Sequence, residues 1–249
     1  MKEFTYKETG KKIGWNFSNL KTKKVVPSNY NYYKECCSNI NNNTVMLDVG
    51  CGSCEKSLRY FSLAQQVVAI DNEVEMLKKA KANAVKYFGE KGAEKFIFQI
   101  GDCDNLEDFE SEVFDLVVTR HCGTNMKDAY RILKKGGMFI SEDIDKHDCW
   151  ELKQVFNRGQ EFNEEELIKR KIFNECLDAG FSKIELLNFE EIEYYQTVED
   201  LEFLLENTPT IDGYDKEKDY PTLEKYIKEN TTEQGIRLIR RLFAYKLIK

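Results

Sequence analysis

Apolar and polar positions follow a regular alternation through the first half of this chain. Between residues 45 and 141, short apolar runs alternate with longer segments in which apolar residues such as Leu77, Ala80 and Ala84 recur every three or four positions. This alternation predicts parallel strands joined by crossover helices. The predicted strands are Val45–Val49, Val67–Ile70, Phe96–Ile100, Val113–Val118 and Met138–Ser141.

The pattern becomes less regular after residue 145. Lys183–Tyr195 predicts a long acidic strand, and Arg241–Lys249 predicts a closing strand. We expect these two strands to pair as a hairpin that carries a helical insertion at residues 197–234. The chain of 249 residues is long enough for one α/β domain. We assign that domain to residues 44–249 and expect residues 1–43 to form an N-terminal leader that acts as a lid.

Polar residues at three places predict where helices begin. Ser53 is expected to cap the helix after the first strand. Thr197 with Asp200 is expected to cap the first helix of the insertion. Pro221 fits the first position of a further helix, because that position needs no backbone N–H.

The first predicted strand leads into a glycine-rich turn. Asp48 is followed by Gly50 and Gly52, and a helix then begins, so its backbone amides face whatever lies over the turn. A dinucleotide site needs a third glycine, but Glu55 stands at that position. The carboxylate before Gly50 would also repel a diphosphate and attract a cation. The turn therefore predicts a site for an adenine nucleoside that carries positive charge.

Acidic residues stand at the carboxyl ends of the first three predicted strands. Asp48 precedes the turn, Asp71 follows the second strand, and Asp102 follows the third. Ligands of open parallel sheets bind at this edge, and an acid placed about as far along the chain as Asp71 can hold the hydroxyls of a ribose. Each acid alone is equally compatible with a helix cap or a turn. Their combination favours a nucleoside site.

Five segments resemble, in order and spacing, the motifs of the class I S-adenosylmethionine-dependent methyltransferases. The resemblance covers about residues 40–145, and the later segments resemble uncharacterised bacterial members of the same superfamily. It implies a Rossmann-like, doubly wound α/β fold with a mostly parallel seven-stranded sheet in the order 3-2-1-4-5-7-6, whose last strand is antiparallel. The segments are Leu47–Gly52, Ile70–Asp71, Gly101–Cys103, Phe114–Val118 and Leu133–Ile140.

The resemblance also implies a set of contacts to S-adenosylmethionine. The backbone of the glycine turn would contact the methionine part, with Asp48 near its ammonium group. Asp71 would hold the ribose, Asp102 and Cys103 would hold the adenine, and Arg120 would lie below the sulfonium. The complete expected set is Asp48, Gly50, Cys51, Gly52, Asp71, Asn72, Met76, Asp102, Cys103 and Arg120.

His121 is the candidate catalytic residue. Methyl transfer needs a general base only when the acceptor must lose a proton, and His121 follows the fourth strand, where acceptors face the methyl group. An exposed loop histidine is the structural alternative. Cys122 offers a thiol nucleophile for ring methylation, although a small buried cysteine is the commoner reading.

Metal and disulfide readings of the chain are weaker. Cys51 and Cys54 have the spacing of a zinc or redox motif, but no second pair completes four ligands. His147 with nearby acids fits solvated turn residues better than a metal site. We therefore expect no metal. Without an export signal or a run of about 18 apolar residues, we expect a cytoplasmic protein with no membrane contact and without structural disulfides among its 8 cysteines.

Net charge decides between two classes of methyl acceptor. The chain carries a formal charge of −7, which disfavours a nucleic-acid backbone. The favoured function is therefore methylation of a small molecule at oxygen or nitrogen. RNA methylation is the alternative, supported by the locally basic C-terminal arginines Arg237, Arg240 and Arg241. A non-catalytic S-adenosylmethionine-binding module is the third reading, and the sequence does not indicate the oligomeric state.

Overall fold

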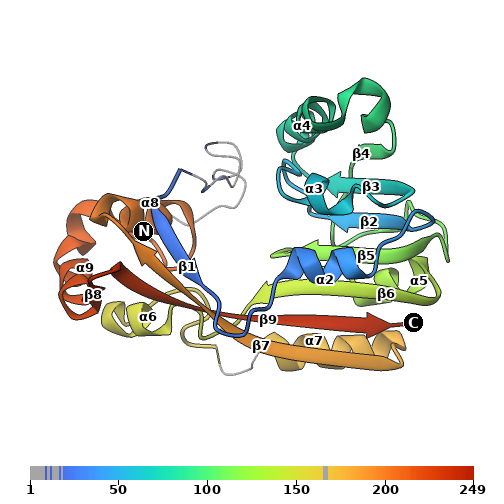
Figure 1. The fold of residues 1–249 in the computed structure, drawn as a ribbon. Helices are drawn as coiled ribbons and strands as arrows, with labels where there is room; N and C mark the ends of the chain where they lie inside the picture. Colours follow the sequence, from blue (N-terminus) through green and yellow to red (C-terminus); the bar gives the residue numbers. More distant parts are fainter. Residues whose placement is uncertain (1–8, 10–11, 13–16, 18, 165–167) are drawn as a thin grey trace. The chain divides into compact units, whose positions relative to one another are not determined.

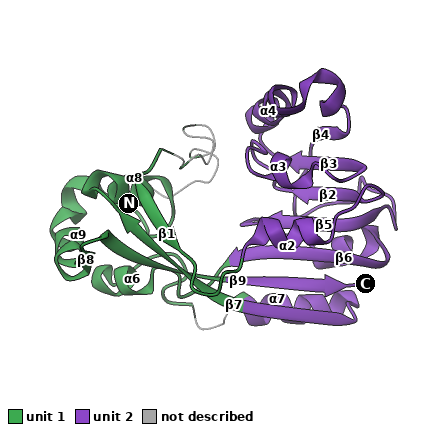
Figure 2. Cartoon of the chain, viewed as in Figure 1, with its two compact units in different colours: residues 1–30, 144–168, 188–242 green, residues 31–143, 169–187, 243–249 purple. Residues whose placement is uncertain are grey.

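The chain forms two compact units, drawn in green and purple in Figure 2. The computed structural model describes residues 9, 12, 17, 19–164 and 168–249. Unit 1 comprises residues 1–30, 144–168 and 188–242, and unit 2 comprises residues 31–143, 169–187 and 243–249. Much of the expected leader lies outside the described residues. Its described part includes strand β1 (Thr22–Val25) and helix α2 (Tyr32–Ser38), and its role as a lid stays a prediction.

Parallel strands form the centre of unit 2 (Figure 1). They lie in the order β4-β3-β2-β5-β6, and each neighbouring pair is parallel. Met46, Leu47 and Val49 of β2 are fully buried, as expected for a central strand of a parallel sheet. The carboxyl ends of these strands therefore share one edge. The strands are β2 (Val45–Val49), β3 (Gln66–Asp71), β4 (Phe96–Ile100), β5 (Phe114–Arg120) and β6 (Leu133–Ile144).

Strands β7 (Lys183–Tyr195) and β9 (Gly235–Ile248) contribute residues to both units. Lys249 N–H donates to Gly137 C=O at 3.0 Å, and Asp145 N–H donates to Arg241 C=O at 3.0 Å. Residue numbers thus rise along β6 as they fall along β9, so these strands are antiparallel. The full order is β1-β7-β9-β6-β5-β2-β3-β4, with β8 (Thr231–Thr232) paired to β9. The predicted fold class and strand order are confirmed, and β1 and β8 are additions to them.

The helices of unit 2 bury apolar faces against these strands. Helix α4 packs on β3 and β4, and its buried face includes Met76 and Ala80. Gly89 interrupts α4 with a φ of 69°, where its sequence predicts a stop, and the helical hydrogen bonding resumes beyond it. The other helices are α3 (Ser57–Phe61), α4 (Val74–Ala93), α5 (Met126–Ile132) and α7 (Ile168–Ala179).

Unit 1 has its own hydrophobic core. Helix α9 packs against α6 and α8, and the predicted insertion 197–234 supplies α8, α9 and β8. Thr197 Oγ1 accepts from Asp200 N–H at 3.1 Å, which confirms the predicted cap of α8. Fully buried members of this core include Leu201, Leu223 and Leu238. The helices are α6 (Trp150–Phe156), α8 (Val198–Asn207) and α9 (Lys216–Asn230).

Two predicted helix starts are wrong. Helix α3 begins at Ser57 rather than after Ser53, because Cys54 adopts a left-handed φ of 54° and adds a turn before the helix. Helix α9 begins at Lys216, where the Asp215 side chain accepts from two backbone N–H groups at 3.2 Å. That cap satisfies donors at the helix start, so Pro221 falls inside the helix.

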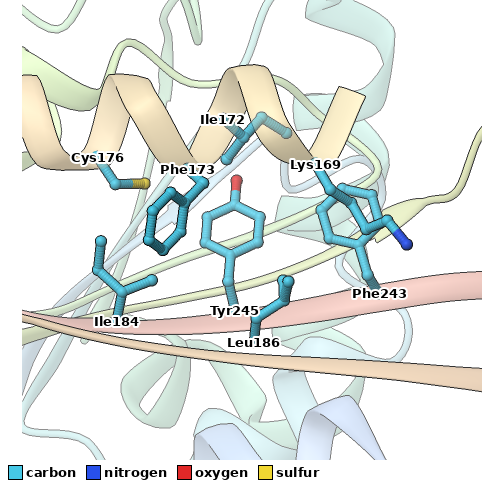
Figure 3. Close-up of a pocket in the computed structure, with 8 residues that line it drawn as sticks. All are labelled: Lys169, Ile172, Phe173, Cys176, Ile184, Leu186, Phe243 and Tyr245. Atoms are coloured by element: carbon cyan, nitrogen blue, oxygen red, sulfur yellow. The ribbon is translucent and has the colours of Figure 1, made fainter. Parts of the chain in front are cut away.

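A small apolar groove lies between α7 and the strands β7 and β9 of unit 2 (Figure 3). It contains none of the predicted site residues. Among the described residues, we find no helix with the length and apolar character needed to span a membrane. The groove is lined by Lys169, Ile172, Phe173, Cys176, Ile184, Leu186, Phe243 and Tyr245.

Candidate active site

The glycine turn directly follows β2. Gly50 and Gly52 have φ of 67° and 54°, a region that side chains disfavour. A Cβ on Gly50 would lie 2.7 Å from Cys122 Sγ, whereas a Cβ on Gly52 would meet no heavy atom within 4 Å. Cys51 N–H donates to Ile70 C=O at 2.9 Å and so ties the turn to β3. The turn is therefore closely packed at Gly50 and open to a ligand at Gly52.

Asp71 ends β3 and holds the turn in place. Its Oδ2 accepts from Gly52 N–H at 2.8 Å, and its Oδ1 accepts from Glu73 N–H at 2.9 Å. Burial raises the pKa of Asp71 above its ordinary value, and the two backbone hydrogen bonds oppose that rise. A carboxylate offers about four lone-pair sites. Both oxygens can therefore still accept hydrogen bonds from ribose hydroxyls.

Asp48 is a buried carboxyl within β2, with 7% of its surface exposed. Burial raises the pKa of Asp48 to about 7, and the nearby charge of Asp71 adds to the rise. A hydrogen bond with Ser57, the first residue of α3, acts in the opposite direction. A cation placed beside Asp48 would favour its ionised form.

Asp102 and Cys103 occupy the loop after β4. Asp102 is exposed, and its Oδ1 accepts from Asp104 N–H at 3.0 Å, so one carboxylate oxygen already stabilises the turn. Cys103 C=O accepts from Asn125 N–H at 3.2 Å. This contact joins the loop after β4 to the loop after β5 and brings both to the same edge of the sheet.

Asn72 and Met76 complete the predicted cofactor contacts but differ in exposure. Asn72 directly follows Asp71 and is exposed. Met76 lies in the first turn of α4 and is only 2% exposed. Its side chain therefore belongs to the packed layer below the edge of the sheet.

Arg120 ends β5 and faces Glu142, its register partner on β6. Its Nε donates to Glu142 Oε1 at 2.6 Å, and Glu142 is 3% exposed. The guanidinium carbon lies 5.9 Å from the centroid of the Tyr33 ring of α2, which stacks on Tyr60 at 5.1 Å. A bare guanidinium would repel a cationic ligand. Glu142 therefore neutralises the one predicted contact whose charge opposes such a ligand.

His121 follows Arg120 with a left-handed φ of 55°. Its N–H donates to Glu142 C=O at 2.9 Å, and its Nε2 lies 3.8 Å from Glu142 Oε1. The side chain is 30% exposed. The imidazole thus stands beside the Arg120–Glu142 pair and remains accessible.

Comparison with known families identifies the chain. The family model described as "Methyltransferase domain" matches residues 40–226. The chain belongs to this methyltransferase domain family. The match confirms the class I methyltransferase membership, the methyltransferase class of enzyme and the cofactor S-adenosylmethionine that the sequence led us to expect.

Curated relatives resemble part of this methyltransferase. A demethylmenaquinone methyltransferase of Leptospira interrogans is 30% identical over 122 residues, which are 45% of this chain and 48% of that protein. The uncharacterised methyltransferase YcgJ of Bacillus subtilis is 29% identical over 105 residues, 39% of this chain and 40% of the relative. The chain thus spans about half the length of the curated relatives it matches.

A solved structure of the same fold covers most of the methyltransferase. The crystal structure of YcgJ from Bacillus subtilis has a TM-score of 0.59 at 15% identity, covering 88% of this chain and 97% of that one. Phosphoethanolamine N-methyltransferase 2 of Haemonchus contortus, solved in complex with S-adenosyl-L-methionine, has a TM-score of 0.53 at 16% identity, covering 99% of this chain and 60% of that one. At these identities the likeness shows the fold alone.

The metal alternatives acquire specific local contacts in the methyltransferase. His147 Nδ1 lies 3.1 Å from Asp145 Oδ1, and its ring packs edge-on against Trp150 at 4.9 Å. Among the described residues, possible ligand atoms gather within 4.8 Å of one another at Asp102, Cys103 and Asp104. One oxygen of Asp102 already accepts from the backbone there. We assign no metal to this loop.

Three residues of the site were absent from the predicted set. Glu142 pairs with Arg120, Ser57 with Asp48, and Tyr60 with Tyr33. The acid after the fifth predicted strand was a usable signal for Glu142, since acids at strand ends had already pointed to Asp71. Ser57 and Tyr60 carry no comparable signal, because their roles depend on where α3 begins.

Proposed function

We propose that this methyltransferase transfers the methyl group of S-adenosylmethionine to an oxygen or nitrogen atom of a small-molecule acceptor. One observation supports the proposal most directly. Asp71 accepts from Gly52 N–H at the open end of the glycine turn, so a ribose-binding carboxylate and an accessible backbone lie together. That pairing suits a nucleoside without a diphosphate, since the carboxylate would repel phosphate groups.

In this proposal the chain binds its cofactor from several loops at one sheet edge. The glycine turn of Gly50, Cys51 and Gly52 binds the methionine part, and ionised Asp48 attracts its ammonium group. Asp71 with Asn72 holds the ribose. The remaining contacts are Asp102 and Cys103 to the adenine, Arg120 below the sulfonium, and Met76 as packing beneath the ribose loop.

The cofactor supplies an already activated methyl group on a positively charged sulfur. The chain therefore has to hold the acceptor in line with that methyl group and exclude water. Glu142 keeps the Arg120 guanidinium from opposing the positive cofactor. His121 is placed to take a proton from a hydroxyl or protonated amine acceptor, and an acceptor without such a proton would make it dispensable.

A small acceptor fits the charge of this chain better than RNA. The net charge is −7, and the C-terminal arginines that supported RNA binding are engaged internally. Arg240 is buried and binds Asp148 through its Nε at 2.9 Å, while Arg241 pairs with Glu151 at 2.6 Å. The relatives named above include a demethylmenaquinone and a phosphoethanolamine methyltransferase, and both names describe small molecules.

Calorimetry tests the cofactor half of the proposal. We expect the wild-type chain to bind S-adenosylmethionine and Asp71→Ala to bind at least about tenfold more weakly, because charged hydrogen bonds are worth about 1.5–3 kcal/mol each. The exposed acid Asp108, in the loop between β4 and β5, provides the matched control Asp108→Ala. Undiminished affinity in Asp71→Ala would contradict the assigned ribose contact.

Methyl-labelled cofactor and cell extract test the acceptor half. We expect label to appear in the small-molecule fraction, and to remain there after nuclease treatment of the extract. Label lost on nuclease treatment would transfer the assignment to RNA. Cofactor binding without any labelled product would favour the non-catalytic binding module.

A further inference from the structure

Two thiols connect separate loops at the candidate cofactor site. Cys103 follows β4 and Cys122 follows β5, and the thiol of Cys122 is hydrogen-bonded to that of Cys103. The same two loops are joined through the Asn125 N–H, which donates to Cys103 C=O at 3.2 Å. The two sulfur atoms are thus held together by the fold, although the residues lie 19 positions apart.

The position of Cys122 is tightly constrained. Its C=O accepts from Thr119 Oγ1 at 2.8 Å. Its Sγ and Cβ lie only 2.7 and 2.8 Å from where a Cβ on Gly50 would be. The Cys122 side chain therefore packs directly against the backbone of the glycine turn. Cys103 and Cys122 are each partly exposed, so small reagents have access to the pair.

The two thiols differ in their readiness to ionise. The hydrogen bond from Cys122 lowers the pKa of Cys103, against the opposing effects of burial and of Asp104 and Asp102. The same hydrogen bond, followed by burial, raises the pKa of Cys122. Because the thiolate is the attacking species in disulfide exchange, Cys103 reacts first and Cys122 follows.

We propose that Cys103 and Cys122 form a reversible modification site that closes to a disulfide by exchange with a small disulfide such as glutathione disulfide. The Cys103 thiolate attacks one sulfur of the reagent and releases one thiolate. Cys122 then gives up its proton, attacks the Cys103 sulfur and releases the second. The net change converts two protein thiols and one small disulfide into one protein disulfide and two small thiols.

Closure of this pair alters the cofactor site. A disulfide brings the sulfur atoms to about 2 Å, closer than any hydrogen bond between thiols. Cys122 then has to leave Gly50, or the loop carrying Cys103 has to move toward β5. Resting on the proposed function, which places Cys103 beside the adenine, we expect the oxidised protein to bind S-adenosylmethionine about tenfold more weakly.

Cys51 and Cys54 form the competing thiol pair. Their side chains are also hydrogen-bonded to each other, but they lie within a single loop. A disulfide between them would not join the loops after β4 and β5. Peptide mapping separates the two possibilities, because each disulfide links different fragments.

The experiment uses the full chain equilibrated with glutathione disulfide, followed by peptide mapping and by calorimetry with S-adenosylmethionine. We expect a Cys103–Cys122 disulfide, weaker binding, and recovery of both thiols and affinity after reduction by dithiothreitol. In Cys122→Ser the affinity, whatever its value, should no longer depend on the oxidant. Cys54→Ser should retain the oxidant response of the wild type.

Each outcome decides a separate part of the proposal. No Cys103–Cys122 disulfide, or one confined to Cys51 and Cys54, overturns the modification site. A mapped Cys103–Cys122 disulfide with unchanged cofactor affinity overturns its control of the site. Failure of the reduced wild type to bind S-adenosylmethionine contradicts the proposed function instead, and the mapping still tests the disulfide by itself.

Discussion

Asp48 makes the free energy of unfolding depend on pH at the scale of a single residue. Its pKa of about 7 in the folded chain exceeds the ordinary value of 3.8. The folded state thus binds more protons than the unfolded state between these values, so stability falls as pH rises from about 4 to about 7 and changes no further above that. The full loss for this carboxyl is roughly 4 kcal/mol, at about 1.4 kcal/mol per pKa unit.

Urea unfolding of the wild type and Asp48→Asn measures this effect. We expect the stability of the wild type relative to the variant to fall between pH 4 and pH 7, because the amide does not ionise. The difference between the two proteins removes contributions from other titrating groups, including Asp71. A difference that stays constant across this range would show that Asp48 is not the group with the raised pKa.

Residue types predicted the acids of the site better than their partners. Asp48, Asp71 and Asp102 stand beside strand ends in the sequence, so their common edge could be inferred from the strand pattern alone. Glu142 reaches Arg120 because β5 and β6 pair in a register that aligns the two residues. Cys122 meets Gly50 and Cys103 through the turn after β5. Such contacts require coordinates, because spacing along the chain does not encode them.

At the scale of elements, Pro221 is a source of instability in α9. It lies in the second turn of a helix that begins at Lys216. Proline has no N–H, so Glu217 C=O lacks its helical donor, and an interior proline costs about 3 kcal/mol. We expect Pro221→Ala to raise the free energy of unfolding by about 1–3 kcal/mol, part of the gain being offset by greater freedom of the unfolded chain.

Denaturant unfolding checks this expectation, with Lys225→Ala as a control at an exposed position of the same helix. The control should change stability by less than about 0.5 kcal/mol. A less stable Pro221→Ala variant would mean that the proline ring packs favourably where the helix needs it.

Elements with strong periodicity were predictable, whereas their ends were not. Lys183–Tyr195 matches β7 in full, because its acidic and apolar residues carry a clear strand pattern. The start of α9 was missed because two signals competed, and the side-chain cap of Asp215 prevailed over the preference of proline for a first turn. Strand β1 lies in a segment whose four residues are all exposed, so burial leaves no periodicity to detect.

At the scale of the whole molecule, two units share continuous strands. Because β7 and β9 pass from one unit into the other, unfolding of either unit removes strand partners from both. We therefore expect a single cooperative transition. Trp150 reports on unit 1, and in a Trp15→Phe background it is the remaining tryptophan of the chain.

The cofactor provides the test, because its proposed contacts lie in unit 2. At about one hundred times its dissociation constant, S-adenosylmethionine should stabilise the folded chain by about 2.7 kcal/mol. Trp150 fluorescence and far-ultraviolet circular dichroism should then shift to the same higher urea midpoint. A Trp150 midpoint that ignores the cofactor would show that the two units unfold independently.

The hydrogen bonds of Asp71 have a consequence for the rate of cofactor capture. Gly52 and Glu73 donate to this carboxylate while the turn is open, so the loop already has an ordered geometry when a ligand arrives. Little rearrangement then separates encounter from capture. In stopped-flow mixing, the observed rate should rise linearly with the concentration of S-adenosylmethionine and show no plateau from a slow loop-closing step.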